Sequence, residues 1–560
     1  MNSYTLAKRR ELGAYYTPPE LSQALANWAI RSVEDSLLEP SFGGCGFLES
    51  CVTRLRQLGN DCPEQNLYGV DIDETAFEIL AQKFQISDIS NKFIFDDFIN
   101  VKPDDFTQKN FDIVIGNPPY ISMHNMTSKQ RISCQDVLDK SIYNERTLGR
   151  NSSLWAFFLL HSLSFLNENG RVAWVLPSSL LHAYYASALI NIHKKHFSKI
   201  KVIKINERFF KDAGADEASV IFVCEGFSSK EVTDGLYNVY SAENVNSLNI
   251  ILNDRSVRIS SKHDNFKLNL LPSEILLTYE NISTQSNCLL LNEIISIKIG
   301  MVTGANEVFV ISNERKNEYN LSDSYLRPVV SRFSDLVGVR HNVFRQNKLI
   351  GNNKRALLLH ASEEQMSEKF TFLRKYLAKV SSEKRAKNRT FKKRHHWYQP
   401  DDGLYPHAFL SYMLHEGPRM VINQAKINCT NSIHRVYFKK KNSTKYKIAV
   451  CLSLLSCYSQ LSAEIEGRSY GSGVLKIEPT AARNIKIILN DSCMEDLFNA
   501  EKSIEKFLNE NNFKKACQTV DDIFIKNGIF TIDECNNLKK GLRFLRNDRY
   551  KGVKANVDEQ

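Results

Sequence analysis

Residues 111–120 read Phe-Asp-Ile-Val-Ile-Gly-Asn-Pro-Pro-Tyr, and this stretch decides the fold of the first part of the chain. The apolar run 111–116 predicts a buried strand, since short apolar runs bounded by turn signals are typical of parallel sheets. The turn Asn117-Pro118-Pro119-Tyr120 follows at once, and its prolines restrict their own backbone and that of the residue before each. Because ligands of open α/β sheets bind beyond the carboxyl ends of strands, this turn lies where a site is expected.

Apolar segments alternate with helical ones on both sides of that stretch, over roughly the first 225 residues. We expect further strands near 36–38, 67–70, 93–95, 171–176, 201–205 and 219–224, and helices from residue 17, over 154–166 and over 180–196. Thr17 is expected to cap the first helix, with Glu20 completing a capping box. This alternation is typical of an α/β domain with a largely parallel sheet.

The rest of the chain reads differently. After about residue 226 the sequence becomes polar and loses helical period, which predicts a linker. Short strands separated by loops rich in Lys, Asn and Ser follow, and the last part shows apolar residues at helical spacing. We therefore expect an α/β domain at 1–228, a mixed α+β domain at 268–492 and a helical segment at 493–560.

Composition sets limits on the class of protein. The 560 residues carry 73 Lys+Arg against 63 Asp+Glu, and this mild excess of +10 is compatible with a nucleic-acid partner. The N-terminus lacks the apolar core of a signal peptide, and the apolar run 155–166 is too short to span a bilayer, so we expect a soluble cytoplasmic protein. The 12 cysteines form no C-x-x-C pair, so reduced thiols are expected and a metal site is not.

Residues 39–48, Glu-Pro-Ser-Phe-Gly-Gly-Cys-Gly-Phe-Leu, form a glycine-rich loop between a predicted strand and an apolar helix. Glycines there permit a tight turn and close approach of the backbone to a ligand. The loop matches neither G-x-G-x-x-G nor a phosphate-binding loop, which disfavours dinucleotides and nucleoside triphosphates. Taken alone, such a loop is more often a structural turn than a cofactor site.

Acidic side chains follow two of the predicted strands. Asp71 is placed to accept both hydroxyls of a ribose, and Asp73 to cap the next helix. Asp97 is placed to accept from an adenine amino group while Phe98 stacks on the ring, and Asp96 fits a solvated turn. A helix cap remains the alternative for Asp71 as well.

Taken in order, Tyr15-Tyr16-Thr17-Pro18, the loop 39–48, Asp71, Asp97-Phe98 and Asn117-Pro118-Pro119-Tyr120 resemble the gamma-type, TaqI-like N6-adenine DNA methyltransferases. The resemblance implies a Rossmann-like methyltransferase domain that uses S-adenosylmethionine, followed by a DNA target-recognition domain and the helical segment. It implies methyl transfer to a flipped-out adenine of double-stranded DNA in a restriction–modification or related defence system. We expect a monomer, with any restriction endonuclease on a separately encoded chain.

The resemblance also assigns site residues. The cofactor would be held by Tyr16, Thr17, Glu39, Pro40, Ser41, Gly43, Asp71, Ile72, Asp97, Phe98 and Pro119. The catalytic turn would be Asn117, Pro118, Pro119 and Tyr120. The loop departs from the family at Cys45, which stands where a glycine is usual, so either the turn shifts by one residue or Cys45 tolerates its conformation.

The chemistry of the turn supports that assignment. An adenine amino group is a poor nucleophile because its lone pair is delocalised into the ring. The Asn117 amide oxygen and the Pro118 carbonyl can accept its two protons and favour a more nucleophilic nitrogen. Tyr120 offers a flat face for an unstacked base. The resemblance implies that an aromatic residue stacks on the other face, for which Phe210 fits best and Phe209 is next. Packing of Phe209 and Phe210 in the core is the alternative for that aromatic pair.

A basic segment, residues 384–398, stands out in the second half. Its cationic residues are Lys384, Arg385, Lys387, Arg389, Lys392, Lys393 and Arg394, and it ends in Trp397-Tyr398. Such a run suits contacts to DNA phosphates, with a solvated helix face as the alternative. Methylation of RNA or protein glutamine through the same turn, or a non-catalytic DNA-binding subunit, are the other functions considered. Chain length and the leading Tyr-Tyr-Thr-Pro argue against both methylation alternatives.

Overall fold

A computed structural model gives the fold of this chain. It describes residues 17–84, 89–143, 148–150, 152–181, 184–206, 219–232, 235–254, 263, 265–367, 371–440, 443–469 and 473–550. The chain divides into two compact units at Leu270/Leu271. Each unit is described by itself.

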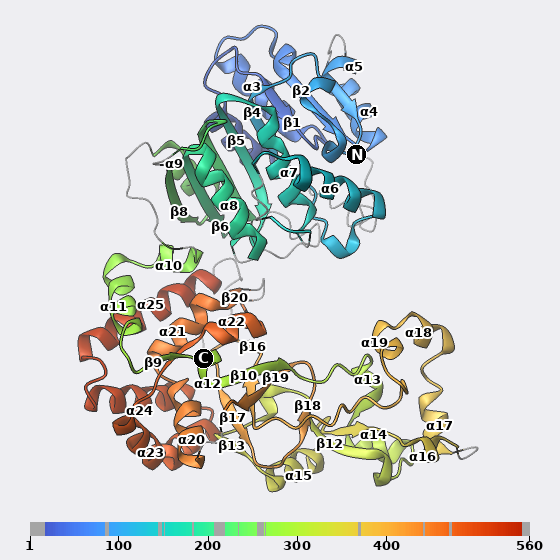
Figure 1. Cartoon of the computed structure of the whole chain (residues 1–560), viewed down its shortest axis with the longest axis vertical. Helices are drawn as coiled ribbons and strands as arrows, with labels where there is room; N and C mark the ends of the chain where they lie inside the picture. Colours follow the sequence, from blue (N-terminus) through green and yellow to red (C-terminus); the bar gives the residue numbers. More distant parts are fainter. Residues whose placement is uncertain are drawn as a thin grey trace. The chain divides into compact units, whose positions relative to one another are not determined.

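Unit 1 is built on an eight-stranded sheet in the order β3-β2-β1-β4-β5-β7-β6-β8 (Figure 1). The strands are β1 (Leu37–Glu39), β2 (Leu67–Asp71), β3 (Phe93–Phe95), β4 (Phe111–Gly116), β5 (Leu166–Pro177), β6 (Phe197–Ile205), β7 (Ser219–Phe227) and β8 (Leu236–Ala242). Only β7 is antiparallel to its neighbours. The chain moves outward from β1 to β3 and then returns to β4, so β1 and β4 flank the crevice where ligands of such sheets bind.

Helices cover both faces of this sheet. One face carries α2 (Pro19–Ala29), α3 (Gly46–Gln57), α4 (Glu74–Lys83) and α9 (Val245–Asn253), and the other carries α6 (Ser128–Lys140), α7 (Leu154–Ser162), α8 (Tyr184–His196) and α10 (Phe266–Leu270). The short α5 (Ile89–Lys92) leads into β3. Successive residues of β4 serve opposite cores, because Ile113 and Ile115 pack with α2 and α3 whereas Val114 packs with α7.

The end of the first domain is later than the sequence predicted. Residues 236–242 form β8, which pairs in parallel with β6 and adds an eighth strand to the sheet. The helix α9 then packs against α2, and α10 completes the unit at Leu270. Most of the linker predicted between 228 and 268 therefore belongs to unit 1. The sequence did not reveal this, because alternating polar residues on an edge strand hide its pairing with the sheet.

The start of the first helix also differs from its prediction. Pro18, not Thr17, is the N-cap residue of α2, and no side chain caps this helix. The capping box predicted from Thr17 and Glu20 is therefore wrong. The hydroxyl of Thr17 instead accepts a hydrogen bond from the side chain of Asn117.

The described residues of unit 2 form four small sheets. Five strands lie in the order β10 (Ile295–Ile299), β19 (Ile433–Phe438), β15 (Ala408–Ser411), β17 (Met420–Asn423) and β13 (Arg340–His341). Four more lie in the order β11 (Val310–Ile311), β14 (Leu357–Leu359), β12 (Leu326–Val330) and β18 (Asn428–Cys429). The remaining sheets are β16 (Met413–Leu414), β21 (Leu475–Lys476) and β20 (Arg468–Ser469), and β22 (Lys486–Ile488) with β9 (Cys288–Leu290).

Short helices separate these strands. They are α11 (Ser273–Ser283), α12 (Leu291–Ile294), α13 (Asn306–Phe309), α14 (Asn313–Glu318), α15 (Val343–Gly351), α16 (Glu363–Ser367), α17 (Phe372–Leu377), α18 (Ser382–Lys387), α19 (Arg389–Lys392), α20 (Thr444–Ser453), α21 (Cys457–Glu466) and α22 (Pro479–Asn484). The C-terminal part is helical, with α23 (Asp491–Asn509), α24 (Phe513–Lys526) and α25 (Ile532–Tyr550). Arg340 forms two hydrogen bonds to Glu501, at 2.5 and 2.6 Å, and so ties β13 to α23.

Among the described residues, no single helix combines the length and the hydropathy needed to cross a bilayer. The pair α20 and α21 reaches both thresholds only jointly, and a bend of 67° separates the two.

Candidate active site

The turn Asn117–Tyr120 lies at the carboxyl end of β4, as the sequence predicted. The amide nitrogen Nδ2 of Asn117 donates to Oγ1 of Thr17 at 3.2 Å. The Ser41 hydroxyl donates to the backbone carbonyl of Asn117 at 3.3 Å. Three segments far apart in the sequence therefore meet at Asn117, and the bond from Nδ2 fixes which way its amide oxygen faces.

Tyr120 is held from the other side. Its hydroxyl donates to the backbone carbonyl of Val175, on β5, at 3.1 Å. Pro118 is buried, while Pro119 and Tyr120 are half-buried. A ring fixed at its hydroxyl and still accessible to solvent is suited to stacking, because it loses little further freedom when a base lies on it.

Glu39 and Pro40 lie against the end of β4. A side-chain carbon at Gly116 would stand 3.7 Å from Cγ of Glu39 and 3.8 Å from Cδ of Pro40. These are ordinary van der Waals distances, so the end of β1 packs directly beside the residue that precedes the catalytic turn. The residues predicted for the cofactor and those predicted for catalysis are neighbours in this structure.

The glycine-rich loop is tied to β2 through Asp71. Oδ2 of Asp71 accepts the backbone N–H of Gly43 at 2.8 Å, and Oδ1 accepts that of Asp73 at 2.9 Å. Asp73 in turn caps α4 through the backbone N–H of Thr75, as predicted. Each oxygen of Asp71 retains a second lone pair, so the carboxylate can hold the loop and still accept from a ligand.

Cys45 adopts the left-handed conformation, with φ of 64° and ψ of 19°. Of the two alternatives left open by the sequence, the structure therefore has the second, in which Cys45 tolerates the conformation of the usual glycine. Its side chain is fully buried beneath α3. Burial raises the pKa of its thiol, so Cys45 stays protonated and packs as a small apolar residue.

Two buried carboxyls dominate the electrostatics of the site. Glu39 is 3% exposed and Asp71 is 9% exposed. Burial, followed by the charge of Asp71, raises the pKa of Glu39 well above its usual value. Burial likewise raises the pKa of Asp71 to about 6, against the lowering effect of its bonds to Gly43 and Asp73.

These carboxyls fit the S-adenosylmethionine that the resemblance implies. Oε2 of Glu39 is buried and accepts no hydrogen bond from the described residues. The ammonium group of the cofactor's methionine part would supply the missing donor and positive charge, and ribose hydroxyls would supply donors to Asp71. A cationic ligand with several donors offsets the free-energy cost of two neighbouring buried carboxylates.

Asp97 and Phe98 follow β3, and Ile72 follows β2, the strand that pairs with β3. Asp97 accepts from the backbone N–H of Ile99 at 3.2 Å and from Nε2 of Gln130 at 3.3 Å. Ile72 is 48% exposed, as an apolar contact for an adenine ring requires. Gln130, on α6, was missed by the sequence analysis, since no local pattern predicts its contact with Asp97.

Phe98 requires a correction. Its side chain is 1% exposed and packs with Phe158, His161 and Phe165, at ring-centroid distances of 5.0–5.2 Å. The ring is part of the core between α7 and the sheet, so the stacking on adenine predicted from the sequence is wrong. Burial of this ring is favoured by the hydrophobic effect, and the sequence pattern Asp-Phe does not reveal it.

Tyr16 and Phe210, predicted to contact the cofactor and the flipped base, lie outside the described residues. Pro40, Ser41, Gly43 and Thr17 all lie within the described part, at the carboxyl ends of β1 and β4.

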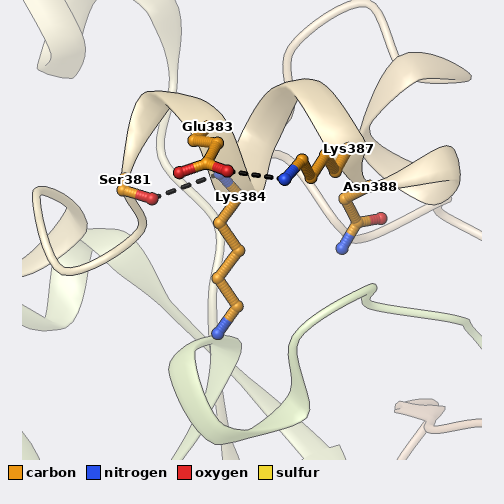
Figure 2. Close-up of a pocket in the computed structure, with 5 residues that line it drawn as sticks. All are labelled: Ser381, Glu383, Lys384, Lys387 and Asn388. Atoms are coloured by element: carbon orange, nitrogen blue, oxygen red, sulfur yellow. Dashed lines mark hydrogen bonds and ion pairs between the residues drawn. The ribbon is translucent and has the colours of Figure 1, made fainter.

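The basic segment of unit 2 lies on α18, α19 and the turn that follows. Lys384, Arg385, Lys387, Arg389, Lys392 and Lys393 are exposed. Ser381, Glu383, Lys384, Lys387 and Asn388 line a depression on this surface. Figure 2 shows Lys387 paired with Glu383 at 2.5 Å within α18, and Lys384 extending away from that pair. Lys384 is 3.4 Å from Glu307.

Arg394 differs from the other cations of the segment. It is half-buried, and its guanidinium donates to the backbone carbonyls of Val302 and, at 2.8 Å, Thr303. Burial lowers the pKa of Arg394 from its usual value. Arg394 therefore holds the loop before α13. Because its guanidinium already donates to these two carbonyls, it is less available for the predicted contact with DNA phosphates than the exposed cations are.

Two known protein families match this chain, one over most of unit 1 and the other over most of unit 2. The family described as N-6 DNA Methylase matches residues 1–236. The family described as Type II methyltransferase M.Eco57I, C-terminal domain, matches residues 263–525. The Type II methyltransferase M.AccI of Acinetobacter calcoaceticus is 24% identical over 492 residues, covering 85% of each chain. M.HincII of Haemophilus influenzae is 25% identical over 256 residues, covering 46% of this chain and 42% of its own.

Solved structures show the same fold. The Type IIL restriction-modification enzyme MmeI, solved in complex with DNA, has a TM-score of 0.61 at 14% identity. This likeness covers 99% of the present chain and 80% of that one. A nuclease-deletion mutant of the Type ISP restriction-modification enzyme LlaGI, with a DNA substrate mimic, has a TM-score of 0.51 at 11% identity, over 88% and 55% of the two chains. The chain accordingly shares its fold with these restriction-modification enzymes, and unit 1 is a mixed α/β domain.

Proposed function

We propose that this chain, which belongs to the N-6 DNA methylases of restriction–modification systems, methylates the N6 amino group of an adenine flipped out of duplex DNA. Its cofactor is S-adenosylmethionine. The observation that carries the proposal is the position of Asn117. Its amide lies at the carboxyl end of β4, fixed by Thr17, beside the buried carboxyl of Glu39. Membership of the gamma-type subclass is part of the same proposal.

The catalytic turn activates the amino nitrogen. The Asn117 amide oxygen and the Pro118 carbonyl accept the two amino protons, which draws the nitrogen's lone pair out of the ring. S-adenosylmethionine, when bound, supplies an electrophilic methyl group on a positively charged sulfur. Because the attacking nitrogen and the methyl group need only be aligned, the main contribution of the chain is positioning.

Tyr120 stabilises the adenine base after it has left the DNA double helix. Removing a base from the stack costs a few kcal/mol, and an aromatic face recovers about 1–3 kcal/mol of it. The bond from the Tyr120 hydroxyl to Val175 holds the far end of that ring in place. Phe210 is the proposed partner on the opposite face of the base.

The ends of β1, β2 and β3 hold the cofactor. Glu39 binds the ammonium group, Asp71 accepts from the ribose hydroxyls, and Asp97 accepts from the adenine amino group. Ile72 packs on the adenine ring, and Pro119 faces the methyl donor. Tyr16, Thr17, Pro40, Ser41 and Gly43 complete the proposed cofactor site.

Unit 2 provides the proposed target-recognition surface for double-stranded DNA. Exposed ion pairs such as Lys387–Glu383 are worth less than about 1 kcal/mol, so phosphates readily replace the glutamate. Lys392, Lys393 and Arg389 carry their charge on the same exposed segment. The enzyme acts as a monomer in this proposal, and any restriction endonuclease is a separate chain.

The test is methyl transfer from tritiated S-adenosylmethionine to duplex DNA. We expect Asn117→Ala to lower kcat by about 100–1000-fold, the usual cost of removing one hydrogen-bonding group from a transition state. Asn125→Ala is the matched control, since Asn125 is an exposed asparagine eight residues further on, outside the turn. Label in ribosomes or protein glutamine but not in DNA, or full activity of Asn117→Ala, would overturn the proposal.

A further inference from the structure

Three side chains of unit 2 direct their polar atoms at one point. Nε2 of His396 is 2.6 Å from Oε1 of Glu363 and 2.7 Å from Nδ1 of His395. Glu363 begins α16, and the two histidines follow α19. All three donor atoms lie within 4.8 Å of one another.

A single proton on Nε2 of His396 does not account for both of its short contacts. A ring nitrogen carries either one N–H or one lone pair, so Nε2 of His396 can bond to Glu363 or to His395 but not to both in full. Both contacts are nevertheless short for hydrogen bonds. A cation at the shared point satisfies all three groups together, because each then turns a lone pair toward it.

The donor set is that of a transition-metal site. Two imidazole nitrogens and a carboxylate oxygen bind Zn²⁺ in sites that keep further positions open. Donors around Zn²⁺ lie roughly 3.3 Å apart, so binding asks these atoms to separate by roughly 0.6 Å. Small side-chain rotations provide that, since the Glu363 side chain is 70% exposed. The His396 ring is fixed by stacking on Tyr398, with centroids 5.3 Å apart.

Among the described residues, a second group of three side chains of metal-ligating type contrasts with this one. Cys457, Asp521 and Cys535 also converge, and all are buried. Asp521, however, already accepts from the backbone N–H of Cys457 at 2.8 Å and pairs with Lys539 at 3.0 Å. One thiol can donate to the other across their 3.8 Å separation. That group is complete without an ion, whereas the histidine group is not.

We propose that Glu363, His395 and His396 bind one divalent transition-metal ion, of which Zn²⁺ is the representative. The ion joins α16 to the turn that ends the basic segment, and so braces that segment against the rest of unit 2. It also replaces the negative charge of Glu363 with a net positive one, held by histidines two to four residues from Lys392 and Lys393. Neither the cofactor nor methyl transfer takes part in this binding.

The experiment is calorimetric titration of Zn²⁺ into the full-length protein, without a polyhistidine tag and after removal of bound metal. We expect one equivalent to bind and to raise Tm, because a ligand that binds only the folded chain stabilises it. His396→Ala should weaken binding by more than the 10–100-fold that losing an outer partner of a metal ligand costs. Glu363→Gln should weaken it in the same direction, and both variants should lose the Zn²⁺-dependent rise in Tm.

His124→Ala is the matched control, since His124 is exposed and lies in unit 1. Cys535→Ser tests the alternative location. Binding that survives in the His395→Ala/His396→Ala double variant, or that is lost in Cys535→Ser and kept in His396→Ala, would overturn the proposal. Failure of the wild-type protein to bind Zn²⁺ at all would overturn it equally.

Discussion

The two polar surfaces of this molecule are built in opposite ways. At the carboxyl edge of the sheet in unit 1, Glu39 and Asp71 are almost fully buried, and burial raises the pKa of both. On the basic segment of unit 2 the lysines are exposed, and Lys384 and Lys387 pair with Glu307 and Glu383. The first surface holds unfavourable charge that a small cationic ligand relieves, and the second holds solvated charge that a polyanion screens.

This difference explains what each surface recognises. A buried carboxylate discriminates strongly, because any partner must supply the missing hydrogen bond and charge in one geometry. An exposed lysine contributes affinity with little dependence on geometry, as phosphate contacts do. Substitutions at the sheet edge should therefore change cofactor binding sharply, and those on the basic segment should change the salt dependence of DNA binding gradually. The largest effect on turnover is expected at Asn117, which lies in the catalytic turn itself.

Glu39→Gln should raise the Kd for S-adenosylmethionine by about 10–100-fold, since a charge-assisted hydrogen bond contributes roughly 1.5–3 kcal/mol. Without cofactor, the same substitution should leave Tm unchanged or higher, because it removes a carboxyl whose ionisation burial disfavours. Calorimetric titration and thermal unfolding measure the two effects. Glu49→Gln is the control, an exposed glutamate on α3 that pairs with Lys83 and should leave the Kd within about twofold. A parallel loss of Tm and affinity in Glu39→Gln would contradict the comparison.

Arg394→Ala and Lys393→Ala should separate folding from DNA contact within the basic segment. Removing Arg394 leaves the carbonyls of Val302 and Thr303 without their donor and should lower the free energy of unfolding by about 1–3 kcal/mol. Lys393→Ala should change it by less than about 0.5 kcal/mol, and should reduce the slope of log K for DNA against log salt by about 1. Denaturant unfolding and DNA titrations at several salt concentrations give both quantities. Equal stability of the two variants would show that Arg394 is not structural.

The affinity for S-adenosylmethionine should rise as the pH rises through about 6, the pKa of Asp71. Only the carboxylate form accepts from both ribose hydroxyls, so the Kd should fall about tenfold between pH 5 and 7. Asp71→Asn should flatten that part of the profile. Asp73→Asn should retain it, because asparagine also caps α4.

The carboxyl of Asp71 also makes the free energy of unfolding depend on pH. That free energy should fall as the pH rises, whereas the affinity for S-adenosylmethionine should increase. The folded protein without cofactor binds the Asp71 proton more tightly than the unfolded chain does. Its stabilising contribution is therefore complete below the unfolded pKa of 3.8 and is lost as the pH rises through about 6. The full change corresponds to about 3 kcal/mol, and Asp71→Asn should abolish it in unfolding measured across that range.

Cys45 should give the smallest effect. Because its φ is 64°, Cys45→Gly should be more stable than Cys45→Ala by about 1 kcal/mol or less. Glycine takes up the left-handed conformation without strain, while the greater freedom of its unfolded chain opposes part of the gain. Denaturant unfolding of the two variants tests this, and greater stability of the alanine variant would show that this backbone is unstrained.

Much of unit 1 could be predicted, because its signals are local. The strand 111–116 and the turn after it were predicted with their observed bounds, and Asp73 was predicted as a helix cap. Local rules failed where a distant group competed for the side chain. Thr17 was predicted to cap a helix, yet its hydroxyl accepts from Asn117, 100 residues away. Phe98 was predicted to stack on a cofactor, yet three rings from a later part of the chain surround it.

Unit 2 was less predictable for the same reason. Its strands have two to six residues and pair across long separations, so no local period marks them. The sequence argument against metal considered cysteine spacing alone. It did not consider Glu363 and the pair His395-His396, which are more than 30 residues apart in the sequence and meet only in the fold.

The sequence by itself determined the order of the sheet-edge residues and the chemistry of the turn from Asn117 to Tyr120, because residue type and spacing along one strand end are local properties. Only the tertiary structure decided that Cys45 takes the conformation of a glycine, that Phe98 belongs to the core, and that Arg394 supports a loop. Each of these outcomes depends on which distant groups surround the side chain, since burial and hydrogen bonding are properties of the folded chain.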